Sequence, residues 1–218
     1  MSIKLKIPPA AEPLSLTEAK AYLRITDAND DTIITAMIGA VRQQCEEYTK
    51  RALVTQTWEL WMDSFPCGET PKTDGYFETR QLSMVRRLIN IPRPPLRSVA
   101  SLITYDAAGI ATVFPVTHYF VDTASEPGRI ALNSNQMWPL ALREYNAAQI
   151  EFVAGYGDTA ASVPNALKQG MLFLLKILFA DKAKAFETDE PHSLGGLNDK
   201  LLPPIVKGLW NPYRVMSL

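Results

Sequence analysis

Histidine and cysteine are scarce in this 218-residue sequence, which contains two of each. The cysteines, Cys45 and Cys67, lie far apart without CxxC spacing, which argues against a zinc site and against a disulfide-rich scaffold. The histidines, His118 and His192, have no catalytic signature around them, whereas an activated nucleophile needs a base within hydrogen-bond reach. We therefore expect no enzymatic activity, no metal site and no cofactor.

A large net charge and a long hydrophobic run are missing as well. The formal net charge of -1 gives no global attraction to nucleic acid or to an anionic membrane. One stretch raises a membrane question, Met171–Ala180, but Lys176 interrupts it and it is about half of the ~20 residues that a spanning helix needs. Prolines break up the N-terminus before an export signal can form. We expect a buried helix and no membrane partner.

Helical patterns occupy the N-terminal part of the chain. Ser15-Leu16-Thr17-Glu18 reads as a capping box, which starts a helix by satisfying exposed backbone amides. A long amphipathic helix is predicted from Asp31 to Lys50, because apolar residues recur there at helical spacing. Arg42 and Glu46 are expected on its polar side.

A third helix is predicted to open at Val163-Pro164, since proline is tolerated at the first helical position. Its apolar residues lie on several faces, and Phe173, Ile177 and Phe179 extend beyond the main stripe. Such a helix must be covered on more than one side, either by the β-region of its own chain or by a neighbouring subunit.

Between these helical parts the hydrophobic period changes to two, first at Val54–Met62 and last at Gln149–Ala154, which predicts strands. The glycines of Gly155–Asp158 are expected to form a turn from strand to helix, because the lysine and spacing of a phosphate loop are missing. The fold class predicted is α+β: a helical core of two N-terminal and several C-terminal helices, with a central β-rich insertion. The parts are residues 1–51, 52–158 and 159–218, the last packing with the first as one domain.

The C-terminus is aromatic and stiffened by proline. Pro203-Pro204 is expected to start a short helix through Leu209, after which come Trp210, Pro212, Tyr213 and Arg214. Residues of these types are good anchors in a partner's pocket. The alternative is that they pack back onto their own subunit.

Arginines concentrate in one segment of the chain, at Arg80, Arg86, Arg87, Arg93 and Arg97. They are suited to contact phosphates of passing DNA. The alternative, which we favour, is a solvated rim that pairs with acidic residues of a neighbour.

Several phrases taken together, in this order, resemble the phage head-tail connector (adaptor) family, including its longer members once labelled as possible DNA-packaging proteins. The phrases are PLSLTEAKAYLRI, EEYTKRALVTQTWEL, INIPRPPLRSVASLITYDAAG, FVAGYGDTAASVPNALKQGMLFLL and NPYR. The resemblance implies a subunit of the virion neck, assembled in the host cytoplasm. It implies a ring of copies, commonly a dodecamer, that docks on the portal, extends the DNA channel and receives the next neck, stopper or tail protein.

The resemblance also implies roles for particular residues. Trp210, Pro212, Tyr213 and Arg214 become the expected portal contacts, and removing Trp210–Leu218 is expected to abolish portal binding while leaving thermal unfolding nearly unchanged. The expected subunit-interface residues are Ile34, Met37, Val41, Phe173, Ile177 and Phe179.

The alternative function is a DNA-packaging accessory factor that binds DNA or terminase transiently, for which Arg86 and Arg87 would matter most. The segment Cys67–Val85 departs from the family pattern, and we assign it no function.

Overall fold

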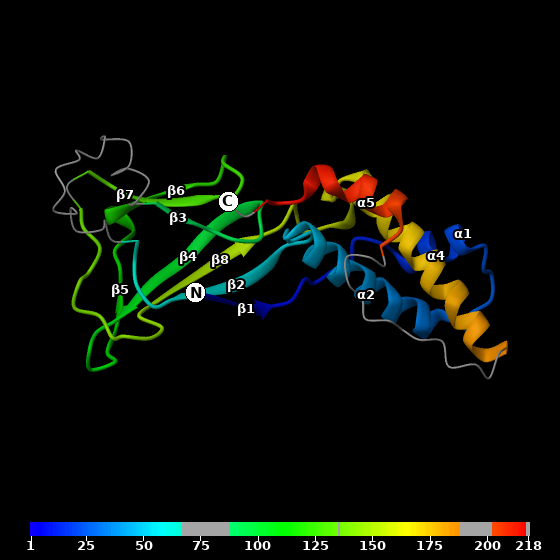
Figure 1. Ribbon diagram of the computed structural model, residues 1–218, viewed down its shortest axis with the longest axis horizontal. Coiled ribbons are helices and arrows are strands. Elements are labelled where there is room, and N and C mark those ends of the chain that lie inside the picture. The colour runs from blue at the N-terminus through cyan, green and yellow to red at the C-terminus, as the bar shows by residue number, and fades with distance from the viewer. Residues whose placement is uncertain (67–87, 135, 188–201, 217–218) are drawn as a thin grey trace, which may run out of the picture. The chain divides into compact units, whose positions relative to one another are not determined.

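The computed structural model describes residues 1–66, 88–134, 136–187 and 202–216. The chain divides into two units, which Figure 1 draws with their elements labelled. The β unit consists of Met1–Pro8 and Thr55–Gly155, and the helical unit consists of Pro9–Val54 and Tyr156–Leu218. Helices and antiparallel sheets are both present, so the predicted α+β class is confirmed.

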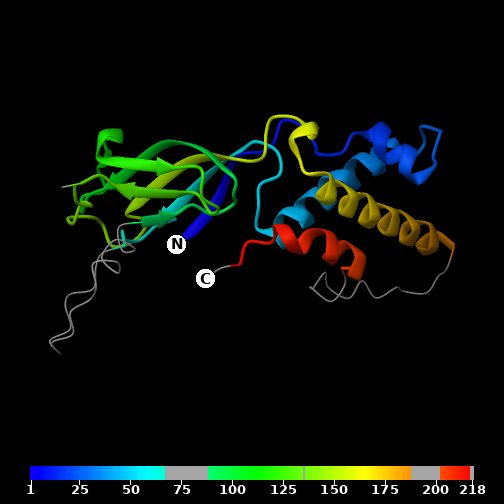
Figure 2. The ribbon, with the colours of Figure 1, turned by 90° about the horizontal axis from the view of Figure 1, so that it is seen from above.

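The helical unit contains α1 (Leu16–Leu23), α2 (Asp31–Thr49), α4 (Asn165–Glu187) and α5 (Pro204–Trp210). The predicted capping box is present: the backbone N–H of Glu18 donates to Ser15 Oγ, and the N–H of Ser15 donates to the Glu18 carboxylate, each at 3.1 Å. Figure 2 shows α1 and α5 on opposite sides of α4. Two short 3₁₀ turns, Ala160–Ser162 and Asn211–Tyr213, complete the unit.

The core of the helical unit forms mainly between α2 and α4. The helix α2 contributes Ile34, Ile38, Val41 and Cys45, and α4 contributes Leu167, Met171, Leu174 and Leu175. All of these side chains are buried, as expected for apolar residues that recur every three or four positions along two facing helices. Burial also raises the pKa of the Cys45 thiol well above its usual range.

The larger sheet of the β unit, sheet A, has the strand order β1-β2-β8-β4-β5. Its strands are β1 (Ser2–Ile7), β2 (Gln56–Met62), β8 (Ala148–Ala154), β4 (Leu96–Tyr105) and β5 (Ala111–Val113), and every neighbouring pair is antiparallel. Leu60, Ile150 and Leu102 lie in one cross-strand row, and each is 1% exposed or less. This row marks the face of sheet A that is turned toward the core.

The smaller sheet, sheet B, has the order β3-β7-β6, with β3 (Leu88–Asn90), β7 (Arg129–Leu132) and β6 (Tyr119–Asp122). Ile89 and Ile130 lie opposite each other, and both are buried. Gly128 lies so close to Leu96 that a Cβ placed on the glycine would be 2.5 Å from the Leu96 Cβ. Sheet B therefore lies against the β4 side of sheet A, and Figure 1 shows β1 at the opposite side.

Candidate functional site

Trp210 ends α5 and is fully buried in the core of the helical unit. Its Nε1–H donates to the backbone carbonyl of Leu167 at 3.2 Å, which satisfies the polar atom of the indole. The ring lies against Gly170, where a Cβ would come within 2.2 Å of Nε1. Among the residues predicted to contact the portal, Trp210 instead packs within its own subunit, as the alternative interpretation had it.

The residues after Trp210 follow the C-terminal end of α2 and are bound to it. The Tyr48 hydroxyl donates to Asn211 Oδ1 at 2.6 Å, and Arg51 Nε donates to the Tyr213 carbonyl at 2.5 Å. The N–H of Val215 donates to the Thr49 carbonyl at 2.9 Å.

Three of the four predicted portal residues remain at the surface. Pro212 and Arg214 are exposed and Tyr213 is half-buried; together we call these three residues the C-terminal patch. The Arg214 guanidinium carbon lies 5.2 Å from the centre of the Tyr48 ring, within the range of a cation–π contact. The patch thus consists of an exposed arginine, an exposed proline and a half-buried tyrosine on a segment anchored by a buried tryptophan.

The six residues predicted for the subunit interface divide by burial. Ile34 and Val41 are fully buried in the core of their own unit, because they lie on the face of α2 that packs against α4. Met37, Phe173 and Phe179 are half-buried at the margin of the same core, and Ile177 is 38% exposed. These last four side chains are at least partly exposed.

Arg42 and Glu46 differ from the prediction, because both are buried although they were expected on the polar side of α2. Arg42 Nη1 donates to Glu46 at 2.9 Å and Arg42 Nε donates to Glu12 at 2.8 Å. Glu46 in turn accepts the backbone N–H of Leu53 at 3.0 Å. Each buried charge is therefore paired, and the network holds the segments before α1 and after α2 against the helix.

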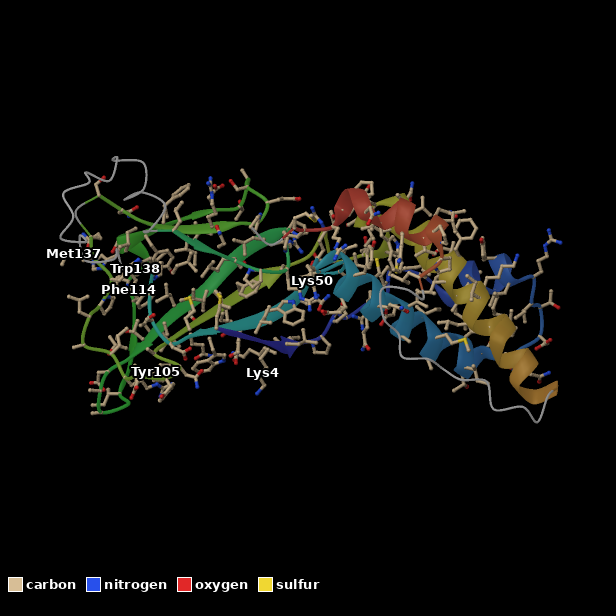
Figure 3. All side chains as sticks on the ribbon, in the orientation of Figure 1. Lys4, Lys50, Tyr105, Phe114, Met137 and Trp138 are labelled. Carbon is tan, nitrogen blue, oxygen red and sulfur yellow. The ribbon has the colours of Figure 1, made fainter. Side chains whose placement is uncertain are left out.

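The outer face of sheet A combines paired charges with stacked aromatic rings. Lys6 donates to Glu151 at 2.7 Å and lies 3.5 Å from Glu59, and these carboxylates raise the Lys6 pKa above its usual value. Trp61 and Tyr105 stack with ring centres 5.9 Å apart. Figure 3 shows Lys4 and Tyr105 along this part of the sheet.

An aromatic cluster fills one end of the β unit. Trp138 stacks on Phe65 with ring centres 4.4 Å apart and lies 5.5 Å from Phe114, and Figure 3 shows Phe114 and Trp138 side by side. The rings of His118 and Phe114 pack edge to face with their centres 5.4 Å apart, so His118 packs against an aromatic ring of its own unit. His192 lies outside the described residues.

The arginines predicted for a DNA channel or rim are only partly described. Arg80, Arg86 and Arg87 lie outside the described residues. The Arg93 guanidinium lies 5.3 Å from the Trp58 ring centre, and Arg97 donates to Thr55 Oγ1 at 2.5 Å. Both described arginines therefore contact neighbours within the β unit.

The glycine-containing stretch Gly155–Asp158 joins β8 to the 3₁₀ turn before α4, as predicted for a turn between strand and helix. In the part of the chain that the structure describes, no three His, Cys, Asp or Glu side chains are grouped so that they could hold a metal ion. None of the described helices has the length and apolarity needed to cross a membrane.

Two comparisons connect this fold to known proteins. Residues 13–91, less than half of the chain, match the family model described as Phage gp6-like head-tail connector protein. No curated protein sequence matches the chain.

Solved structures of gene transfer agent (GTA) particles contain chains of similar fold. A chain from the neck of an empty GTA particle, computed with C6 symmetry, is similar over 100% of this chain and 97% of its own length, at 19% identity and a TM-score of 0.70. A chain from the virion of the native GTA particle covers the same shares at 17% identity and a TM-score of 0.69. A third, from the neck of the native particle computed with C12 symmetry, again covers these shares, at 22% identity and a TM-score of 0.62.

The sequence match and the fold agree with each other and with the motifs of the sequence. The family model covers α1, α2 and β2 and ends at Ile91, just after β3, and the structural similarity extends over the whole chain. The predicted resemblance to the phage head-tail connector family is confirmed by the family model over residues 13–91, and the whole chain shares its fold with chains of the GTA neck.

Proposed function

We propose that this chain is a structural subunit of a phage neck, in which copies form a ring that docks on the portal and extends the DNA channel toward the tail. The observation that carries the proposal is the similarity of the whole chain to a chain of a solved GTA neck, at a TM-score of 0.70. The symmetry of the two neck structures, C6 and C12, supports a ring. In this proposal the helical unit is the connector body and the β unit is an insertion into it.

The C-terminal patch is the proposed portal contact. Its backbone is held at Tyr213 and Val215 by Arg51 and Thr49, so little ordering entropy is lost when Pro212 and Arg214 meet a partner. Trp210 then serves as the internal anchor of the segment. Ring contacts are proposed for the half-buried and exposed apolar residues at the margin of the helical core: Met37, Phe173, Ile177 and Phe179.

The test mixes the full-length protein with the portal protein of the same phage and measures binding and particle size. We expect a ring of the chain bound to the portal, and an affinity about tenfold lower for Arg214→Glu, as for loss of a favourable charged contact. Arg24→Glu, at an exposed arginine after α1, is the matched control and should bind normally. Failure of the unmodified protein to bind the portal would overturn the neck function, and normal binding by Arg214→Glu would overturn the role of the patch.

The accessory-factor alternative rests on Arg80, Arg86 and Arg87, which the structure does not describe. We therefore treat the accessory-factor function as a second outcome of the binding test. Salt-dependent DNA binding by the isolated protein, lost in Arg86→Ala/Arg87→Ala, would favour it over the portal contact.

A further inference from the structure

Strand β1 is an open edge of sheet A. It pairs with β2 on one side, no described strand pairs with it on the other, and all six of its residues are exposed. An edge of this kind presents unpaired backbone N–H and C=O groups that can receive another strand.

Two apolar side chains of β1, Ile3 and Leu5, continue the core face of sheet A and are exposed. Ile3 lies opposite Leu60, and Leu5 lies opposite Trp58, so both belong to the inner cross-strand rows. Leu60 is 1% exposed, whereas Ile3 and Leu5 are 36% and 40% exposed. The exposure arises because sheet B lies toward β4, away from β1 (Figure 1).

The opposite edge of sheet A, formed by β4, also has backbone groups that no described strand pairs with. The strand β4 pairs with β8 along one of its edges. On its other edge β5 pairs only with Ile103–Tyr105, and no described strand pairs there with Ser98–Ser101. In sheet B, β6 is one of the two outer strands. Its Val121 lies opposite the buried Ile130 but is itself only half-buried. Val121 is therefore a partly exposed apolar side chain on the inner face of sheet B.

Strand direction also matches. Three antiparallel pairings separate β1 from β4, through β2 and β8, so β1 and β4 run in opposite directions. Identical sheets set side by side in the same orientation would therefore bring β1 of one copy antiparallel to β4 of the next. The inner residues Ile3 and Leu5 would meet the row of Val99 and Leu102, and Lys4 would lie beside the small Ser98 and Ser101.

We propose that β1 of one copy adds as a strand to the Ser98–Ser101 edge of β4 in the next copy. The contact joins two different surfaces, so it does not stop at a dimer, and it forms a ring when the rotation from copy to copy closes. This inference rests on the ring of the proposed function and identifies which part of each subunit makes the contact.

Cysteine cross-linking of the full-length chain tests the strand pairing directly. All variants carry Cys67→Ser, while Cys45 is buried and stays. Lys4→Cys subunits are mixed with Ser101→Cys subunits, and in a second sample with Ser98→Cys subunits, under mild oxidation with the portal present. We expect covalent dimers in at least one mixture and none from any variant alone.

Particle size, measured on the same samples, separates the two proposals. If no ring forms, the proposed function fails. If rings form but neither mixture cross-links, the strand pairing is overturned. Dimers from Lys4→Cys alone would also overturn it, because they would show β1 pairing with β1.

A pair of charge substitutions gives a second measurement. Leu5→Glu places a carboxylate in the proposed apolar contact and should raise the concentration for half-assembly about tenfold. Ile110→Glu is the control, since Ile110 is 62% exposed in the turn between β4 and β5 and outside the contact. Equal assembly by the two variants would contradict the proposal.

Discussion

The indole N–H of Trp210 donates to the backbone carbonyl of Leu167, and the ring fills the space that Gly170 leaves free. This contact helps to hold the C-terminal helix α5 against α4, together with Val206 of α5, which is buried in the same core. It requires glycine at position 170 for reasons of space.

Gly170→Ala should therefore destabilise the protein. The new Cβ would come within 2.2 Å of Trp210 Nε1, and overpacking of this kind costs ~1–3 kcal/mol in the free energy of unfolding. The matched control is Gly208→Ala in α5, where a Cβ meets nothing within 4 Å and should stabilise the helix by up to ~1 kcal/mol. Denaturant unfolding measures both; a neutral Gly170→Ala would show that α5 can move away from α4.

Truncation at two adjacent positions should separate folding from binding. Removing Trp210–Leu218 deletes a fully buried tryptophan and should lower the free energy of unfolding by ~3–5 kcal/mol, as in other losses of a core aromatic. The burial of Trp210 thus leads us to expect lower stability, whereas the sequence alone led us to expect nearly unchanged unfolding.

Removing only Asn211–Leu218 leaves Trp210 in the core and breaks the bonds to Tyr48, Thr49 and Arg51. We expect a smaller loss of about 1–2 kcal/mol, with portal binding abolished. Comparable melting temperatures for the two truncations would contradict the anchoring role of Trp210.

Arg42→Met should be among the more damaging polar substitutions in the helical unit. It removes the buried ion pair that Arg42 makes with Glu46, and breaking a buried pair from one side typically costs ~3–5 kcal/mol. Lys50→Met, which removes a surface ion pair with Glu47, should change stability by less than ~1 kcal/mol. Chemical denaturation of the two variants gives the comparison, and equal effects would mean that Arg42 is solvated.

Stability should depend on pH through Glu18. Its pKa is held below the usual value of 4.5 mainly by the backbone hydrogen bond from Ser15, with Lys168 contributing an ion pair at 3.2 Å. A lowered folded-state pKa adds stability above the unfolded-state value, and this stability is lost as the pH falls through the folded-state pKa.

Glu18→Gln should therefore be less stable than the unmodified protein at pH 7 by about 0.5 kcal/mol, a small value because the side chain is largely solvated. The difference should begin to shrink near pH 4.5 and vanish below it. Thr17→Gln, an uncharged change in the same helical turn, should give a difference that is constant with pH. A constant difference for Glu18→Gln would contradict the prediction.

Local chemistry accounts for what the sequence predicted well. The capping box at Ser15, the apolar period of α2 and the alternation in β2 and β8 all place elements within a few residues of their observed bounds. These signals depend on neighbours three or four positions away in a helix, or two in a strand, so they are readable from the sequence.

Long-range pairing accounts for what the sequence did not predict. The alternation Ile3, Leu5, Ile7 is visible in the sequence, but only the pairing of β1 with β2, more than fifty residues later, makes it a strand of the β unit. The burial of Glu46 likewise depends on the backbone N–H of Leu53. Neither partner is marked by spacing or composition.

The portal and interface residues showed the same limit. Their residue types led us to expect that Trp210, Ile34 and Val41 contact a partner. All three do make extensive contacts, but these contacts lie inside their own subunit. Burial by distant segments separates such residues from Pro212, Arg214 and Ile177, which stay at the surface. Composition alone does not make this distinction.

The hydrogen bond from the N–H of Tyr156 to the Leu53 carbonyl, at 3.1 Å, has a practical consequence for protein engineering. The chain leaves the helical unit after Val54 and returns at Tyr156, so its departure and return points are already neighbours. A linker of a few residues could therefore close the helical unit without residues 55–155. Residues 1–8 would have to be removed with them, because β1 would otherwise be left without its partner strand. Such a minimal protein would consist of the helical unit alone. The same junction would also allow one β unit to be exchanged for another.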